Sequence, residues 1–161
     1  MIIRSAKDKD LPEIARIYNQ AILETTATFD TVPKSVEEWR ETLASHNDKF
    51  PLVVAEYEGK IVGWGSLRPF IKRPAARFTV ENAVYVDQDY HGRGIGSAIL
   101  KFLLECAQRE GHHAVVALVV AGNTPSERLH RKLGFETIGV LREVGHKFGR
   151  WLDLMVLEKL L

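Results

Sequence analysis

The part of this sequence best suited to chemistry is a glycine-rich turn that joins an apolar strand pattern to a helical one. Glycines let a backbone approach a phosphate closely, and the free N–H groups and positive dipole end of the following helix attract negative charge. The turn therefore predicts a cradle for a phosphate-bearing ligand; the plainest alternative is a glycine turn that merely precedes a helix. Its residues are His91, Gly92, Arg93, Gly94, Ile95, Gly96 and Ser97, with Arg93 as an added cation.

Two widespread phosphate-binding motifs do not fit this turn. The dinucleotide fingerprint G-x-G-x-x-G needs a third glycine where Ser97 stands, and no opening strand is followed by an acidic partner for a ribose. The P-loop needs a lysine before Ser or Thr, and none follows the turn. The ligand of the cradle must therefore be identified from other residues.

Hydrophobic periodicity indicates the elements that must position the turn. Strands are expected at residues 2–4, 52–57, 61–67, 78–86, 114–120, 135–141 and 150–157. Four helices are expected, beginning at Asp10, Ser35, about Gly94 and Thr124. Asp10, Ser35 and Thr124 each precede a glutamate by three residues, the spacing of a capping box. The order β-α-α-β-β-β-α-β-α-β-β favours a mixed sheet with helices on both faces.

Length and composition narrow the class of protein. The chain has 161 residues, 45% of them hydrophobic and 27% charged, which fits one globular domain over residues 1–161. The net charge of +1 gives little reason to expect nucleic-acid binding. Cys106 is the single cysteine and is expected to be a packed core thiol of an intracellular protein. The N-terminus has no targeting pattern, and the longest apolar run, 114–121, is far shorter than the roughly 20 residues of a membrane span.

Residues 91–96, His-Gly-Arg-Gly-Ile-Gly, resemble the R/Q-x-x-G-x-G/A signature of the GNAT superfamily of N-acetyltransferases, with His91 in place of the usual Arg or Gln. The expected element order is similar to that fold over nearly the whole chain. The resemblance implies an α/β (α+β) GNAT fold: a twisted, mixed, mostly antiparallel central sheet of about seven strands, with about four helices on both faces. It also implies acetyl-CoA as co-substrate, with its pyrophosphate on Gly92 to Ser97, and no metal.

Further segments resemble the phosphinothricin acetyltransferase branch of that family. Members of the branch acetylate small α-amino acids such as phosphinothricin, methionine sulfoximine and methionine sulfone. The resemblance implies direct attack in a ternary complex, and a cytoplasmic, homodimeric detoxification enzyme that binds neither nucleic acid nor membrane. The segments are residues 17–19, 26–29, 79–81, 129–130, 134–135 and 145–153.

The resemblance assigns catalytic and cofactor roles to particular residues. Glu81 would take the proton of the amine, directly or through a water; otherwise it is a carboxylate on a solvated sheet face. His130 would give a proton to the CoA thiolate; otherwise it is a packing histidine. Asn123 would touch the CoA arm; otherwise it only starts a helix. The backbone that would hold the pantetheine arm is that of Val84, Tyr85 and Val86.

The substrate pocket is assigned in the same way. Arg73 and Arg77 match basic positions of the branch and would bind the carboxylate or the tetrahedral head of an amino acid. Phe29 would form an apolar wall, and Lys147 and Trp151 would contribute from the C-terminal hairpin. Two residues depart from the branch in this region: Ile71 replaces an arginine and Ala76 a tyrosine.

Three functions remain open on the sequence. The first is acetylation of a small amino acid, and the second is acetylation of another primary amine, such as an amine drug, a polyamine or a peptide N-terminus. The third is a non-catalytic acyl-CoA sensor that kept the cradle. Retention of Glu81 together with Arg73 favours an enzyme.

Overall fold

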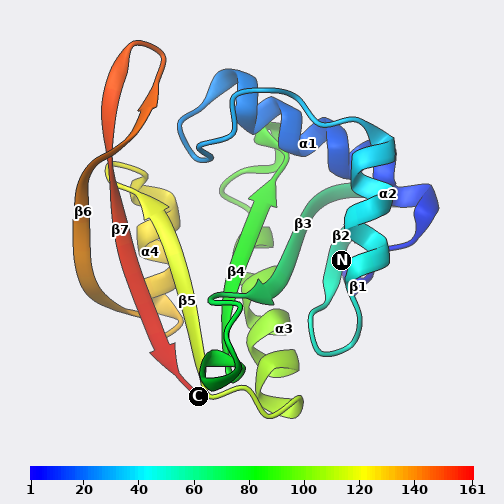
Figure 1. Cartoon of the computed structure of the whole chain (residues 1–161). Coiled ribbons are helices and arrows are strands. Elements are labelled where there is room, and N and C mark those ends of the chain that lie inside the picture. Colours follow the sequence, from blue (N-terminus) through cyan, green and yellow to red (C-terminus); the bar gives the residue numbers. More distant parts are fainter.

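A computed structural model describes all 161 residues, and its seven strands and four α-helices follow the expected order (Figure 1). The helices are α1 (Leu11–Glu24), α2 (Val36–Ser45), α3 (Ile95–Arg109) and α4 (Thr124–Lys132). The strands are β1 (Ile2–Ser5), β2 (Leu52–Tyr57), β3 (Lys60–Pro69), β4 (Thr79–Val86), β5 (Ala114–Val120), β6 (Glu136–Lys147) and β7 (Arg150–Leu160). No helix is long and apolar enough to cross a membrane.

The strands form one sheet in the order β1-β2-β3-β4-β5-β7-β6. Only β4 and β5 run parallel; the other five neighbouring pairs are antiparallel. The prediction of a mixed, mostly antiparallel sheet is therefore confirmed. The parallel pair is joined through α3, as a parallel crossover requires.

The parallel pair is also where the sheet splits. β4 and β5 are in register at only three positions, and Glu81 opposite Val116 is the last of them. β4 then continues to Val86 and β5 to Val120 without pairing to each other (Figure 1). The backbone groups that face this gap are free to bind something other than a neighbouring strand.

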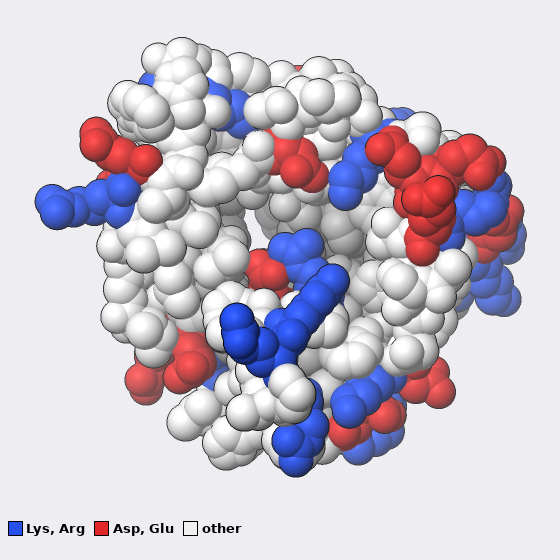
Figure 2. Space-filling model, viewed as in Figure 1, with Lys and Arg blue, Asp and Glu red and all other residues white.

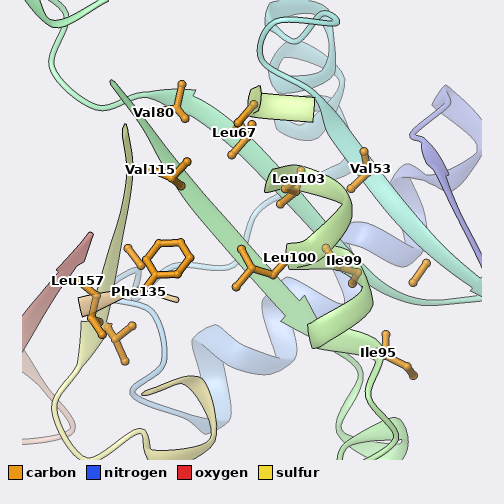
Figure 3. Packing of buried hydrophobic residues seen from close by; sticks show 14 of the residues in the cluster. Val53, Leu67, Val80, Ile95, Ile99, Leu100, Leu103, Val115, Phe135 and Leu157 are labelled. Atoms are coloured by element: carbon orange, nitrogen blue, oxygen red, sulfur yellow. The ribbon is translucent and has the colours of Figure 1, made fainter. Parts of the chain in front are cut away.

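Two apolar clusters hold helices to the two faces of the sheet. On one face α1 and α2 pack through Tyr18 and Trp39 against Trp64 of β3. On the other face α3 packs against the sheet through a second cluster that extends to Phe135 and Leu157 (Figure 3). Cys106 of α3 is buried, as expected. The prediction of helices on both faces is confirmed, and Glu81 stands between the two layers at the split in the sheet.

Two of the three predicted helix caps need correction. Ser35 and Glu38 form the expected capping box of α2. Asp10 does not cap α1, because its carboxylate instead accepts the amide of Lys7 and binds the guanidinium of Arg4. The cap of α4 is Asn123, one residue before the predicted Thr124.

The C-terminal hairpin is longer than predicted. β6 runs six residues past the expected end at 141, and β7 ends at Leu160 rather than 157. A bulge between Leu141 and Gly145 interrupts the alternation of apolar and polar residues from which a strand is predicted. Within the bulge, Glu143 has a positive φ of 56°. The amide of Glu143 donates to Asp153 Oδ1 at 2.8 Å, which holds the bulge to β7.

Candidate active site

A cleft of about 1680 Å³ lies over the split between β4 and β5. It is bounded by α1, the loop after α1, the ends of β3 and β4, the glycine turn, β5 and the start of α4. Figure 2 shows this face of the molecule hollowed at its centre, with acidic and basic side chains together inside the hollow. The cleft is large enough for two small-molecule substrates at once.

The glycine turn lies along this cleft and has free donors. No backbone amide from Gly92 to Ser97 donates to a protein acceptor, because α3 begins only at Ile95. Gly92 and Gly94 adopt the left-handed conformation, with φ of 75° and 77°. A Cβ at Gly94 would meet no protein atom within 4 Å, so the space beside it is open. This row of amides beside open space fits an anion such as a pyrophosphate.

Two side chains of the turn are used within the protein. His91 Nε2 donates to the backbone carbonyl of Val86 at 2.9 Å, so the ring ties the turn to the end of β4. Arg93 stacks over the ring of Tyr90, at 4.9 Å from its centroid, and does not line the cleft. The cradle is therefore made mainly of backbone groups, with His91 as a brace.

The end of β4 presents alternate residues to the gap. The amide of Asp87 donates to Val62 of β3, so by alternation Val84 and Val86 turn their backbone groups away from β3 and toward the gap. The backbone of Tyr85 points at β3 instead. Its ring stacks on Trp64 with a centroid distance of 4.9 Å, and burial raises its pKa to about 12. Of the three predicted residues, Val84 has both backbone groups and Val86 has its amide suited to hold an extended ligand, because the carbonyl of Val86 already accepts from His91.

Glu81 is a buried carboxylate at the apex of the split. Its residue is 7% exposed, so it does not lie on a solvated sheet face. Directly across the sheet, Arg68 of β3 donates from Nε to Glu81 Oε2 at 2.6 Å. This guanidinium supplies the opposite charge that a buried carboxylate needs, and the hydrogen bond to Glu81 raises the pKa of Arg68 above its usual range.

His130 belongs to α4 and contacts β4 through Asn82, on the face of the sheet opposite to Glu81. Its Nδ1 donates to the carbonyl of Ser126 at 2.7 Å, and its Nε2 lies 3.0 Å from Asn82 Nδ2. With a proton on Nδ1, a neutral ring accepts from Asn82 at Nε2. Burial lowers the pKa of His130 below 6.5, which favours this neutral form. A general acid must carry the proton that it gives, so the expected role of His130 requires the scarce protonated form.

Two more predicted residues lie at the cleft, and one supports it from behind. Phe29 lines the cleft and packs on Gly145 of β6, where an added Cβ would lie 2.5 Å from Phe29 Cζ. Asn123 also lines it while its side chain accepts the amide of Ser126 as the cap of α4. Lys147 does not line the cleft; its buried ammonium donates to the carbonyl of Thr28 at 2.9 Å, and burial lowers its pKa. Lys147 therefore fixes the loop that carries Phe29.

The two arginines predicted to bind substrate stand apart from these residues. Arg73 and Arg77 are exposed and do not line the cleft, and Arg77 stacks over the neighbouring ring of Phe78 at 4.4 Å. Ile71 is exposed in the same loop. The cation that the cleft contains beside Glu81 is Arg68, which the sequence reasoning missed. The predicted strand ended one residue before it, and only the register of β3 against β4 shows the pair.

The described chain brings together no group of three or more His, Cys, Asp or Glu side chains that could hold a metal ion.

Residues 3–156 match the family model described as an acetyltransferase (GNAT) domain. The L-methionine sulfoximine/L-methionine sulfone acetyltransferase of Pseudomonas aeruginosa is 41% identical over 163 residues, which cover 97% of this chain and 92% of the relative.

Two solved acetyltransferase structures are similar to this chain over most of their length. The ribosomal-protein-alanine N-acetyltransferase of Brucella melitensis superimposes with a TM-score of 0.97 at 41% identity, covering 100% of both chains. The phosphinothricin acetyltransferase of Sinorhizobium meliloti, solved in complex with acetyl-CoA, superimposes with a TM-score of 0.96 at 33% identity, covering 99% of this chain and 88% of the other.

Proposed function

This chain belongs to the GNAT family of acetyltransferases, and from that premise we propose that it transfers the acetyl group of acetyl-CoA to the α-amino group of a small amino acid. The observation that carries the proposal is the position of Glu81, a buried, ion-paired carboxylate at the point where β4 and β5 separate. The relatives named for methionine sulfoximine, methionine sulfone and phosphinothricin support the substrate class.

The cleft offers a place for each part of acetyl-CoA. The amides of Gly92 to Ser97 would hold the pyrophosphate at the start of α3, where the helix dipole favours negative charge. The backbone of Val84 and the amide of Val86, which β5 leaves unpaired, would hydrogen-bond the pantetheine arm. Asn123 stands across the gap at the end of β5 and would contact the same arm. The thioester would then lie near the apex of the split, beside Glu81.

The transfer step follows from the chemistry of amines. A protonated amine has no lone pair, so Glu81 accepts its proton, directly or across one water. The neutral nitrogen attacks the thioester carbonyl carbon, a C–N bond forms, the C–S bond breaks, and CoA leaves as a thiolate that takes up a proton. Both substrates are bound during this step, so the kinetics are those of a ternary complex. No acyl-enzyme forms.

The two candidate catalytic groups lie on opposite faces of the sheet. The side chain of Glu81 shares the face of Ala83 and Tyr85, which is covered by α1, and Asn82 with His130 lies on the face covered by α3 and α4. We assign the amine to the first face and the departing thiolate to the second. His130 can protonate the thiolate as an imidazolium, and solvent in the cleft supplies the proton otherwise.

One observation favours a second substrate. The Brucella melitensis structure that superimposes over the whole chain is named for ribosomal-protein alanine, which makes a peptide N-terminus the alternative acceptor.

Acetylation also removes the charge of an α-amine, so for a small-molecule acceptor we propose a role in inactivating amino-acid analogues.

A screen of acceptors tests the proposed function. Release of free CoA from acetyl-CoA is followed with L-methionine sulfone, L-methionine sulfoximine, phosphinothricin, a polyamine and an Ala-initiated peptide. We expect the free amino acids to have the highest kcat/KM. A preference for the peptide or the polyamine would replace the amino-acid acceptor, and CoA binding without any turnover would indicate a sensor.

A further inference from the structure

The segment that leads from β4 into the glycine turn, residues 87–90, is held from α1, and the roles assigned above do not use this link. Arg16 Nη2 donates to Asp87 Oδ2 at 2.6 Å, and the amide of Gln88 donates to Gln20 Oε1 at 3.2 Å. Arg16 and Gln20 lie about one turn apart on α1, which lies across the end of β4 (Figure 1). Two residues of one helix therefore fix two successive residues of the segment that enters the cradle.

Asp87 is the most tightly held residue of this segment. It is 4% exposed. Its amide donates to Val62 of β3, its carbonyl accepts from the amide of Tyr90, and its Oδ1 accepts from the amide of Asp89. Its other carboxylate oxygen, Oδ2, accepts from Arg16. Backbone and side chain of Asp87 are thus both used to shape residues 87–90, and Arg16 supplies the cation that this buried carboxylate needs.

The charge on Asp87 depends on this arrangement. Burial acts to raise the pKa of Asp87, but the hydrogen bonds from Arg16 and from the amide of Asp89 outweigh burial and lower the pKa below its usual range. A buried carboxylate that loses its cation must take up a proton, admit water or move toward solvent. Each of these changes disturbs the contacts of residues 87–90, and the glycine turn starts at the next residue, His91.

The pair lies behind the cradle rather than in it. Neither Arg16 nor Asp87 lines the cleft. The donors that would hold the pyrophosphate are the backbone amides of Gly92 to Ser97, and their directions depend on how the chain enters the turn. A shift of about 1 Å takes a donor out of hydrogen-bond range, so a cradle made of backbone groups is sensitive to its supports.

We propose that Arg16 is a positioning residue for acetyl-CoA: by holding Asp87 it sets the path of the chain into the glycine turn, so that the free amides of the turn point at the pyrophosphate. This inference rests on the proposed acetyl-CoA cradle. Arg16 and Asp87 are 71 positions apart in the sequence, so the shape of the cradle depends on α1 as well as on the turn itself.

The test compares the binding of CoA with that of pantetheine, which has the arm of CoA but neither its pyrophosphate nor its nucleotide. Arg16→Ala should weaken CoA binding by roughly 10-fold, as expected for the loss of a charge-assisted hydrogen bond, and should leave pantetheine binding unchanged. Arg16→Lys keeps the charge and should recover part of the loss. Calorimetry gives both affinities, with pantetheine measured by displacement, and circular dichroism shows whether each variant is folded.

A double-mutant cycle separates positioning from direct contact with CoA. Asp87→Asn keeps an acceptor for the amide of Asp89 and removes the charge that Arg16 holds. If Arg16 acts through Asp87, the double variant should bind CoA about as well as Asp87→Asn alone. Arg40→Ala is the matched control, because Arg40 is an exposed, ion-paired arginine of α2 that does not line the cleft, and it should change neither affinity.

Each outcome bears on one proposal. Unchanged CoA affinity in Arg16→Ala, equal losses for CoA and pantetheine, or fully additive losses in the cycle would overturn the inference and leave the cradle standing. A wild type that binds CoA no more tightly than pantetheine would overturn the cradle first, and the role of Arg16 with it. If Arg16→Ala does not fold, Arg16→Lys and Asp87→Asn carry the test, and both should lose affinity for CoA alone.

Discussion

At the scale of single residues, the proposed role of Glu81 as the general base leads to a direct prediction. Glu81→Gln keeps the size of the side chain and removes its basicity, so kcat should fall by about 10²–10⁴, the range for a positioned base. CoA affinity should hardly change, because the cradle lies on the glycine turn. Steady-state kinetics at saturating substrate and calorimetry with CoA make the two measurements.

The pH dependence of kcat/KM can come from a group of the enzyme or from the substrate. The free amine of the substrate titrates in alkali, so it contributes a limb of its own to the pH profile. A series of acceptors with different amine pKa values distinguishes them, because a limb that belongs to the enzyme stays fixed while a substrate limb moves. Near-normal turnover of Glu81→Gln would exclude Glu81 as the base.

His130 predicts a change in stability with pH. Its pKa is lowered by burial in the folded chain, so the unfolded chain, at about 6.5, binds a proton at higher pH than the folded one does. The unfolded state therefore gains protons as pH falls below about 6.5, and the free energy of unfolding should drop through that window until the folded pKa is passed. His46 has a lowered pKa as well and adds to the effect.

Urea unfolding between pH 7.5 and 5 measures this dependence. His130→Gln removes one titrating group and should flatten the curve compared with wild type, even if it is less stable at every pH. His113→Gln is the control, since His113 is exposed and not part of this network. An unchanged slope in His130→Gln would show that His130 is not a source of the acid sensitivity.

At the scale of elements, the start of α3 makes a testable anion site. Gly94→Val would place a side chain in the open space beside the free amides, at a φ of 77° that a β-branched residue resists. CoA affinity should fall strongly. Gly111→Val is a matched control, because Gly111 has the same φ and the same open surroundings but lies at the other end of α3, away from the cleft. Equal CoA affinity in the two folded variants would remove the pyrophosphate from this turn.

The C-terminal hairpin shapes the cleft through one contact. A valine at Gly145 would collide with the ring of Phe29, whereas a valine at Gly139 of the same strand would meet nothing within 4 Å. Gly145→Val should therefore displace Phe29 and raise KM for the amino acid severalfold with CoA affinity intact, and Gly139→Val should do neither. Similar KM values in the two variants would mean that Phe29 does not contact the substrate.

These elements also show what the sequence could and could not predict. Periodicity and capping patterns were enough for the order of strands and helices, because each depends on neighbours along the chain. The Arg68–Glu81 pair depends on which residues of β3 and β4 face each other, and nothing in either strand alone states that register. Asp10 shows the same limit: a capping spacing is present before α1, yet Arg4 of β1 competes for the carboxylate.

At the scale of the whole molecule, the last strand of the sheet is exposed and apolar. β6 is an edge strand whose unpaired side offers free backbone groups. It also exposes four large apolar side chains, a combination that monomers avoid and interfaces use. These are Ile138, Val140, Leu141 and Val144, between 49% and 60% exposed. We propose that a second copy of this chain covers this edge, which would make the enzyme the homodimer that the family resemblance implies.

Light scattering coupled to size exclusion tests the dimer. Wild type should have the mass of two chains at micromolar concentration. Ile138→Glu with Val140→Glu places two like charges on the edge and should give one chain, with the fold kept because both side chains are already exposed. Ile2→Glu is the control: Ile2 is 61% exposed on β1, at the opposite edge of the sheet from β6, and its variant should stay dimeric. A monomeric wild type would contradict the dimer. A double variant that keeps the mass of two chains would show that the interface does not lie on β6.

The dimer also bears on the cleft, because β6 carries Gly145 against Phe29. A partner that holds the hairpin in place supports this contact, so separating the copies should raise KM for the amino acid.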